Sequence, residues 1–570
     1  MAFGSVPLEV TEVAPTLVES RGQVLFADFG KDAYGNLKLG FAAAPRSGDL
    51  TVRLGEKLTP QGTIDRHPPG SVNYRELRLS TRPGQWNYRL TIPSKPFHLG
   101  KASVKMPATI GEVTPFRYVE IEGAGLAPAA LTLRQLFVHV PFDDEASSFD
   151  CSDATLTAVW DLCKHTMKAT TAFGLYIDGE RERVPYEADA YINQLSHYAC
   201  DLDPRVARAT FTHLLAHPTW PTEWSLHMPM IAAADYLATG DAVLARENYA
   251  ELKKKLLLEK AREDGLLVAS AIVDWPGGER DGYNDGQADP KKKQQVGPIV
   301  NTVANAFYYR ALRQMAVLAR GVNREDDARE LEQKAAQVRE SFQRVFFDRV
   351  RGVYVDGEGS THASLHANLF ALAFDLTPPE HVSKVADFIQ SRGMACSVYA
   401  AQYLLEALFA AGRDEYAVKL MTARTERSWW HMVESGSTMS WEAWGPQFKK
   451  NLTWNHAWGA APANIVARFV LGVRPLEPGY ARLLIAPQPG RLAWVRGKVP
   501  TAVGPVTLKL EKFTAFRLEV DLPTRTHTTV ALPLRKQRQV LLDSRPIDVA
   551  GAGSSVNVEV PPGRHTLESR

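Results

Sequence analysis

A helical hydrophobic pattern fills the middle of the chain, from about residue 153 to 473, and it constrains the fold more than any other feature. Ser152 or Asp153 can cap the first helix, and the apolar residues after it recur on one helical face. Most connections between successive helical patterns are short, which favours antiparallel pairs. The predicted helices are 153–171, 188–201, 203–216, 226–239, 241–261, 298–320, 324–345, 363–375, 380–391, 396–412, 414–425 and 457–471.

Twelve helices in pairs predict an all-α (α/α)6 barrel, in which six helical hairpins form a ring. The two flanks instead alternate apolar and polar residues, as in 50–54 and 86–92 on one side and 506–510 and 516–522 on the other. Pro and Gly punctuate both flanks at short intervals, as in sandwiches of short strands. The predicted domains are an N-terminal β-sandwich at 1–148, the (α/α)6 barrel at 149–477 and a C-terminal β-sandwich at 478–570.

Composition excludes several kinds of partner. The chain carries a net charge of only +2, and the short lysine runs at 253–255 and 291–293 are typical of solvated faces, so no nucleic-acid partner is expected. No apolar stretch reaches about 18 residues, so no membrane span is expected. The first ten residues lack the charged and apolar regions of a signal peptide, which favours a cytoplasmic location. The oligomeric state is left open.

No motif for a cofactor, a metal or a nucleophilic serine is present. Cys151, Cys163, Cys200 and Cys396 lack metal-ligand spacing, and we interpret them as buried thiols, which favours a reducing compartment. GxSxG, HExxH, P-loop and dinucleotide-binding sequences are all missing. The i, i+4 pair at 362 and 366 offers two histidines without a third ligand. We therefore expect neither a cofactor nor a metal.

Two connections, 267–297 and 426–456, are longer than a compact helical domain needs, and such loops are usually functional. The second contains five tryptophans. Because loops run over the surface, we expect these indoles to be exposed and to offer flat faces to a sugar ring.

A charged stretch at 175–194 precedes the second predicted helix and mixes acidic, basic and aromatic residues. It fits either a salt-bridged loop or a site where neighbouring charges set the pKa of an acid. Glycoside hydrolysis needs two carboxyl groups on opposite sides of the bond. The stretch offers Glu182, with Glu180 and Glu187 as competitors, and the second long loop offers Glu442, with Glu434 as competitor. Spacing alone does not choose among them.

From about residue 115 to 500 the chain resembles the α-L-rhamnosidase family, glycoside hydrolase family 78. Phe149-Asp150-Cys151-Ser152-Asp153 resembles the start of the family's catalytic barrel, and Asp178, Glu182 and Asp189 resemble its acidic loop. Ser-Thr-Met-Ser-Trp-Glu-Ala-Trp, which contains Glu442, resembles its general-base motif. The other matching segments are Asn455-His456, Trp458-Gly459-Ala460, Asp274-Trp275 and Glu223-Trp224-Ser225.

The resemblance implies an exo-acting, inverting glycosidase that releases terminal α-L-rhamnose, with Glu182 as acid and Glu442 as base. Asp178 and Asp189 would hold ring hydroxyls and, as anions, keep Glu182 protonated. Aromatic walls would suit the methyl group of a 6-deoxy sugar. The implied substrate-binding residues are Asp178, Arg181, Tyr186, Asp189, Trp224, Asp274, Trp275, Trp441, Trp444 and His456.

The chain departs from the family pattern around the sugar pocket. Gly179-Glu180 replaces a Cys-Pro pair, Tyr186 stands where a Trp is usual, and Glu187-Ala188 replaces a Gly-containing pair. These changes leave open a glycosidase for another deoxy sugar or a uronic acid. The sequence also leaves open a sugar epimerase or isomerase with His456 or His366 as base, and a non-catalytic carbohydrate-binding protein.

Overall fold

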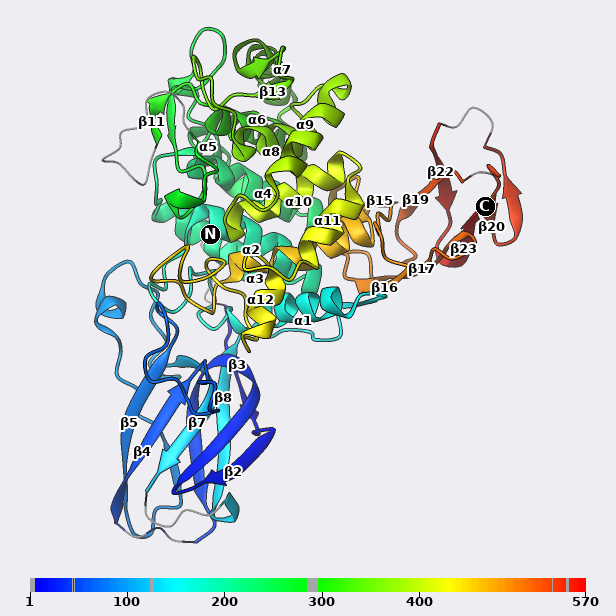
Figure 1. Cartoon of the computed structure of the whole chain (residues 1–570). Helices are drawn as coiled ribbons and strands as arrows, with labels where there is room; N and C mark the ends of the chain where they lie inside the picture. The colour runs from blue at the N-terminus through cyan, green and yellow to red at the C-terminus, as the bar shows by residue number, and fades with distance from the viewer. Residues whose placement is uncertain are drawn as a thin grey trace.

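The computed structural model describes residues 6–570 except 44, 46, 124–127, 284–295, 536 and 550–552. A helical region lies between sheets formed by the two ends of the chain (Figure 1). The lysine run at 291–293 and part of the loop at 267–297 lie outside the described residues. Among the helices that the structure describes, none has the length and apolar character to cross a membrane. All four cysteines are buried free thiols, as predicted.

The N-terminal sheet is antiparallel, with the strand order β1-β8-β3-β7-β4-β5, and β2 and β6 also pair with β3. Alternate residues such as Leu50, Val52 and Leu54 point into its core, as the period-two pattern predicted. Its strands are β1 (Glu9–Val13), β2 (Leu17–Arg21), β3 (Val24–Phe41), β4 (Gly48–Gly55), β5 (Tyr74–Thr81), β6 (Asn87–Arg89), β7 (Thr114–Glu122) and β8 (Leu131–His139).

All twelve predicted helices are present in the central region. One further helix, α12, has six residues, too few to show a period in the sequence. The helices are α1 (Ala154–Ala169), α2 (Glu187–Cys200), α3 (Arg205–Ala216), α4 (His227–Thr239), α5 (Val243–Lys254), α6 (Thr302–Gly321), α7 (Glu325–Phe346), α8 (Leu365–Ala373), α9 (Pro379–Arg392), α10 (Val398–Ala410), α11 (Asp414–Met421), α12 (Trp429–Glu434) and α13 (Ala461–Ile465). Short strands β10 (Ala269–Ala271), β11 (Val296–Ile299), β12 (Phe347–Asp348) and β13 (Val353–Tyr354) form two hairpins between them.

Six alternate helices follow one another around a closed ring. Helix α2 contacts α4, and the contacts continue through α6, α8, α10 and α13 back to α2. Helices such as α8 and α10 are buried on almost every side. By contrast, α7 is amphipathic, with one buried stripe and one charged face, and it packs outside α6. The ring therefore forms the core of the central region, and its connecting loops can carry a site.

The C-terminal part forms two sheets, β14-β15-β19-β22 and β21-β20-β23-β18-β17-β16-β9. Strand β9 (Ser148–Cys151) comes from before α1 and pairs with β16, so the predicted domain boundary at 148/149 falls inside a strand of the C-terminal sheet. The remaining strands are β14 (Val473–Pro475), β15 (Arg482–Ile485), β16 (Trp494–Val499), β17 (Val506–Glu511), β18 (Phe516–Leu522), β19 (His527–Pro533), β20 (Val540–Leu542), β21 (Arg545–Ile547), β22 (Ser555–Val560) and β23 (Gly563–Ser569).

Candidate active site

A cavity of about 330 Å³ brings together residues from four distant segments of the helical region. Both predicted carboxylates line it, together with most of the predicted substrate-binding residues. The predicted residues in its lining are Asp178, Arg181, Glu182, Tyr186, Asp189, Trp224, Trp275, Glu442 and His456. The cavity is therefore the candidate active site.

The loop between α1 and α2 carries Glu182 and folds tightly against the segment before α13. Gly179 has a φ of 93°, and a Cβ there would lie 3.0 Å from the carbonyl oxygen of Asn455 and from the Thr453 hydroxyl. Only glycine fits this left-handed backbone and this close approach. Asp178 closes the loop, because its backbone N–H and its side-chain Oδ1 both bond Val184 at 3.0 Å.

Arg181 bridges the two glutamates. One terminal nitrogen of its guanidinium contacts Glu182, and the other lies 3.0 Å from Oε1 of Glu442. The Tyr186 hydroxyl donates a 2.9 Å hydrogen bond to the second oxygen of Glu182. Two carboxyl groups from loops far apart in the sequence thus face one guanidinium, which orients both.

Glu442 is almost fully buried and is held by donors on both oxygens. Lys449 Nζ lies 3.1 Å from Oε1, and the backbone N–H of Thr453 donates to Oε2 at 3.1 Å. The Trp458 indole donates to the Glu442 carbonyl at 3.0 Å. Burial lowers the pKa of the Lys449 ammonium, while the neighbouring Glu442 opposes that shift. Two cations and a backbone N–H thus surround the Glu442 carboxyl group.

Asp189 and His456 form a buried pair, with His456 Nε2 2.8 Å from Asp189 Oδ1. Burial raises the pKa of Asp189 to about 8 and lowers the pKa of His456 to about 3. Burial also raises the pKa of Asp178 well above its usual range. Burial therefore disfavours the anionic forms that were expected of Asp178 and Asp189 beside Glu182. Both line the cavity, where they are placed to exchange hydrogen bonds with a ligand.

Aromatic rings form much of the cavity wall, as predicted for Tyr186, Trp224 and Trp275. The Tyr186 and Trp224 rings meet edge to face, with centroids 5.8 Å apart. The sequence interpretation missed five further lining residues. They are Trp220, Ile272, Lys449, Asn451 and Trp458. Trp220 had a usable signal, because it stands between two prolines in a break between helices, whereas Lys449 had none.

Two predicted substrate-binding residues, Trp441 and Trp444, lie outside the cavity lining. Trp441 stacks on Trp454 with ring centroids 4.7 Å apart, and the Trp444 indole donates to the Cys396 carbonyl at 2.8 Å. Both rings are buried. The expectation of exposed indoles in the 426–456 loop is wrong, because this loop folds inward and Trp429, Trp441, Trp444 and Trp454 form part of the core.

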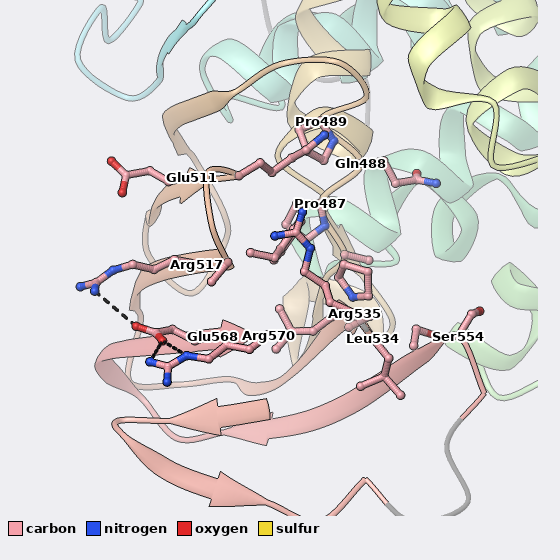
Figure 2. Close-up of a pocket in the computed structure, with 18 of the residues that line it drawn as sticks. Pro487, Gln488, Pro489, Glu511, Arg517, Leu534, Arg535, Ser554, Glu568 and Arg570 are labelled. Carbon is pink, nitrogen blue, oxygen red and sulfur yellow. Dashed lines mark hydrogen bonds and ion pairs between the residues drawn. The ribbon is translucent and has the colours of Figure 1, made fainter. Parts of the chain in front are cut away.

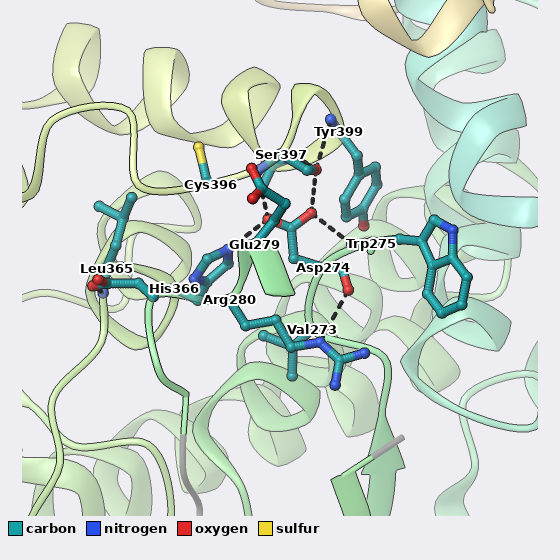
Figure 3. Close-up of polar contacts among 12 residues, drawn as sticks. Val273, Asp274, Trp275, Glu279, Arg280, Leu365, His366, Cys396, Ser397 and Tyr399 are labelled. Atoms are coloured by element: carbon teal, nitrogen blue, oxygen red, sulfur yellow. Dashed lines mark hydrogen bonds and ion pairs between the residues drawn. The ribbon is translucent and has the colours of Figure 1, made fainter. Parts of the chain in front are cut away.

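Asp274 also has a different place from the one predicted. It is fully buried and accepts hydrogen bonds from His366 Nε2 at 2.7 Å, the Ser397 N–H at 2.9 Å and the Trp275 N–H at 2.8 Å (Figure 3). Asp274 therefore fixes Trp275, which does line the cavity. His366 is fully buried in the same cluster, which disfavours it as the base of an isomerase. Among the described residues, no group of three His, Cys, Asp or Glu is placed to hold a metal ion.

A larger cleft of about 1480 Å³ lies beside the C-terminal sheets (Figure 2). Two carboxylates in its wall are neutralised by neighbouring cations. Glu511 pairs with Lys509 at 2.7 Å. Glu568 pairs with Arg517 and Arg570. Its lining combines Pro487, Pro489 and several arginines with neither Trp nor Tyr among the described residues. The facing carboxyl groups that glycoside hydrolysis requires occur in the smaller cavity.

Two models of known protein families match most of the chain. Residues 144–470 match the family model described as the bacterial alpha-L-rhamnosidase 6 hairpin glycosidase domain. Residues 472–544 match the model described as the bacterial alpha-L-rhamnosidase C-terminal domain.

Individual relatives carry the same description. An alpha-L-rhamnosidase of Alteromonas sp. (strain LOR) is 27% identical over 298 residues, 48% of this chain and 30% of that protein. The solved alpha-L-rhamnosidase of Dictyoglumus thermophilum has a TM-score of 0.80 and 19% identity, covering 99% of this chain and 64% of that one. The Streptomyces avermitilis alpha-L-rhamnosidase complexed with L-rhamnose has a TM-score of 0.76 and 18% identity, covering 99% and 54%. The chain spans less than two thirds of each relative's length.

Proposed function

The chain belongs to the bacterial α-L-rhamnosidase family with a six-hairpin glycosidase domain, and on this premise we propose that it is a glycoside hydrolase releasing terminal α-L-rhamnose. One observation carries the proposal. Glu182 and Glu442, from loops far apart in the sequence, meet in one aromatic-walled cavity and contact the same guanidinium. Two carboxyl groups flanking a small pocket are the requirement of glycoside hydrolysis.

The proposed mechanism inverts the anomeric configuration. Glu182 gives its proton to the glycosidic oxygen, and Glu442 takes a proton from a water that attacks the opposite face of the sugar. Lys449, Arg181 and the Thr453 N–H support the charge that Glu442 must carry as base. After product release, solvent restores the proton of Glu182 and removes that of Glu442.

The cavity suits a single sugar ring. Its volume of about 330 Å³ is at the lower end of the range for small-molecule sites. Asp178, Asp189 and His456 present polar atoms for ring hydroxyls, while Ile272 and the surrounding indoles offer an apolar surface for the methyl group of a 6-deoxy sugar. The proposed substrate is therefore a terminal rhamnosyl group, bound by an exo-acting enzyme.

We also infer that the central region is an (α/α)6 barrel flanked by β-sandwiches. The closed series of contacts from α2 through α13 supports the ring, with α1, α3, α5, α7, α9 and α11 as the outer members of six hairpins. The description of the matching family model, with its six hairpins, gives independent support.

The test is hydrolysis of a panel of aryl glycosides by the wild-type chain and by Glu182→Gln and Glu442→Gln. We expect release from the α-L-rhamnoside and a loss of about 10²–10⁴-fold in kcat in each variant. Proton NMR of the first-formed sugar should show the inverted anomer. Full activity of Glu182→Gln, or initial retention of configuration, would contradict the assigned roles.

A second candidate is a uronic acid as the sugar at the same site. Two cations, Arg181 and Lys449, line the cavity and would attract a carboxylate. Both also contact Glu442, so much of their charge is already neutralised, which favours rhamnose. The same panel separates the two, because turnover of an aryl uronide without turnover of the rhamnoside would select the second candidate.

A further inference from the structure

The loop at 178–184, here termed the acid loop, has a second face that turns away from the cavity. Arg181 and Glu182 line the cavity, whereas Glu180 and Arg183 are buried, with 0% and 1% of their surfaces exposed. Glu180 and Arg183 pair with each other at 2.8 Å. The acid loop therefore presents some side chains to the site and others to the protein on its far side.

The N-terminal domain supplies the partners of this second face. Arg183 donates to Glu112 Oε1 at 2.7 Å and to the Val113 carbonyl at 3.0 Å, and Lys95 lies 3.3 Å from Glu180 Oε1. Lys95, Glu180, Arg183 and Glu112 thus alternate in sign along one row. Two of the four belong to the connection between β6 and β7.

The same connection also binds the backbone of the acid loop. His98 Nε2 donates to the Glu180 carbonyl at 2.6 Å, and the Ser103 hydroxyl donates to the carbonyl of Glu182 itself at 2.6 Å. The Val104 N–H donates to the Arg183 carbonyl at 2.8 Å. Three carbonyls within four residues are therefore held by residues 95–113, here termed the clamp.

A contact that only joined two domains would require neither a buried row of charges nor three hydrogen-bonded loop carbonyls. Buried ion pairs seldom add net stability, because removing charges from water offsets their attraction. Arg183 also adopts a left-handed backbone with a φ of 56°, which costs energy for a residue other than glycine. Both features make sense where one geometry of the loop must be selected, since a shift of about 1 Å in a catalytic group costs about 10²-fold in rate.

We propose that the clamp positions the acid loop, with Ser103 and Arg183 as positioning residues for Glu182. The N-terminal domain then forms part of the catalytic machinery, although none of its described residues lines the cavity. What Glu182 does once positioned rests on the proposed glycosidase function. The fixing of the loop is a property of the fold that can be measured without turnover.

The kinetic test compares Ser103→Ala and Arg183→Met with Ser341→Ala, a matched control in which another buried serine hydroxyl donates to a distant backbone carbonyl. If Glu182 is misplaced, the rate of hydrolysis falls most for substrates whose leaving group must be protonated. We expect Ser103→Ala to lower kcat about tenfold on an alkyl α-L-rhamnoside but less than about threefold on the dinitrophenyl rhamnoside, with KM unchanged. Arg183→Lys should recover part of the loss seen in Arg183→Met.

Hydrogen–deuterium exchange of the acid-loop amides gives the second arm. We expect faster exchange across 178–184 in Ser103→Ala and Arg183→Met, with unchanged exchange in α6 and in the Ser341→Ala control. If the wild type hydrolyses no rhamnoside, the proposed function fails. The exchange measurement still tests whether the clamp fixes the acid loop. Exchange and leaving-group dependence equal to those of the control would overturn the proposal.

Discussion

At the scale of single residues, burial changes the chemistry that the sequence led us to expect. At mildly acidic pH Asp189 and His456 would both be charged in water, but the interior favours the neutral form of each. Lys449 remains close to Glu442 because a buried carboxylate needs a compensating charge. Each of these effects gives a measurable consequence.

The raised pKa of Asp189 predicts that stability falls as pH rises from about 6.5 to about 8. The folded state retains this proton up to about pH 8, whereas the unfolded chain releases it near pH 3.9. Stability from this group is thus present at low pH and is lost as pH rises. Below about pH 6.5 the lowered pKa of His456 has the opposite effect on stability, because the unfolded chain then binds a proton that the folded state does not. Between pH 6.5 and 8 the free energy of unfolding should fall by at most about 1.4 kcal/mol per pH unit.

Urea denaturation of the wild type and Asp189→Asn at pH 6.5 and pH 8 measures this effect. The variant has no proton to lose at this position, so its free energy of unfolding should change less between the two pH values. An equal change in both proteins would assign the pH dependence to other groups.

Lys449 is predicted to support Glu442 in its proposed role as general base. Replacement by Met removes one of two cationic contacts to Glu442 and should lower kcat by about 10–100-fold, the cost of a lost hydrogen bond to a charged group. Lys450→Met is the matched control, because its side chain is exposed next to the same loop. Steady-state kinetics on the aryl rhamnoside measure both variants. Equal kcat values for Lys449→Met and Lys450→Met would contradict the role of Lys449 beside Glu442.

At the scale of elements, buried polar groups join helices to the loops that build the site. Asp274 links the loop after β10 to Ser397, the N-cap of α10, and to His366 in the first turn of α8. A single carboxylate thereby ties two inner helices to Trp275 in the cavity wall (Figure 3). The tryptophans of the 426–456 loop act similarly, since their rings pack the loop onto the core.

Asp274→Asn is predicted to weaken this junction. The amide of Asn keeps one acceptor oxygen, but its NH2 group faces the buried donors of His366 and Ser397. Each hydrogen bond to the charged carboxylate that is lost costs about 1.5–3 kcal/mol. We expect a lower Tm and a higher KM, because Trp275 loses its anchor. Asp375→Asn provides the control, since that carboxylate is exposed and pairs only at the surface. A variant with unchanged Tm and KM would contradict the role of Asp274.

At the scale of the whole molecule, the hydrophobic cores divide the chain differently from the sequence. One continuous core joins the helices to both C-terminal sheets and includes Leu508. The N-terminal sheet has a separate core that includes Leu54. Strand β9 completes the C-terminal sheet from the other side of the helical region. We therefore expect the helical region and the C-terminal sheets to unfold as one cooperative unit.

Calorimetry should resolve this division. Leu508→Ala and Leu54→Ala remove equivalent, fully or almost fully buried side chains, each at a cost of about 2–5 kcal/mol. We expect Leu508→Ala to lower the temperature of the transition of the helical region and the C-terminal sheets. Leu54→Ala should shift an earlier or separate transition of the N-terminal sheet. A shift of one common transition by both variants would show a single unit instead.

The sequence by itself determined the order of helical and sheet regions and all twelve predicted helices, because periodicity is a property of neighbouring residues. The family resemblance of local motifs also led to Glu182 and Glu442, and both line the cavity. Only the tertiary structure decided which aromatic side chains meet the cavity, that burial raises the pKa of Asp189, that Lys449 and Trp220 line the cavity, and that the clamp contacts the acid loop. These depend on burial and on contacts between segments far apart in the chain. Such contacts leave no periodic signal in the sequence.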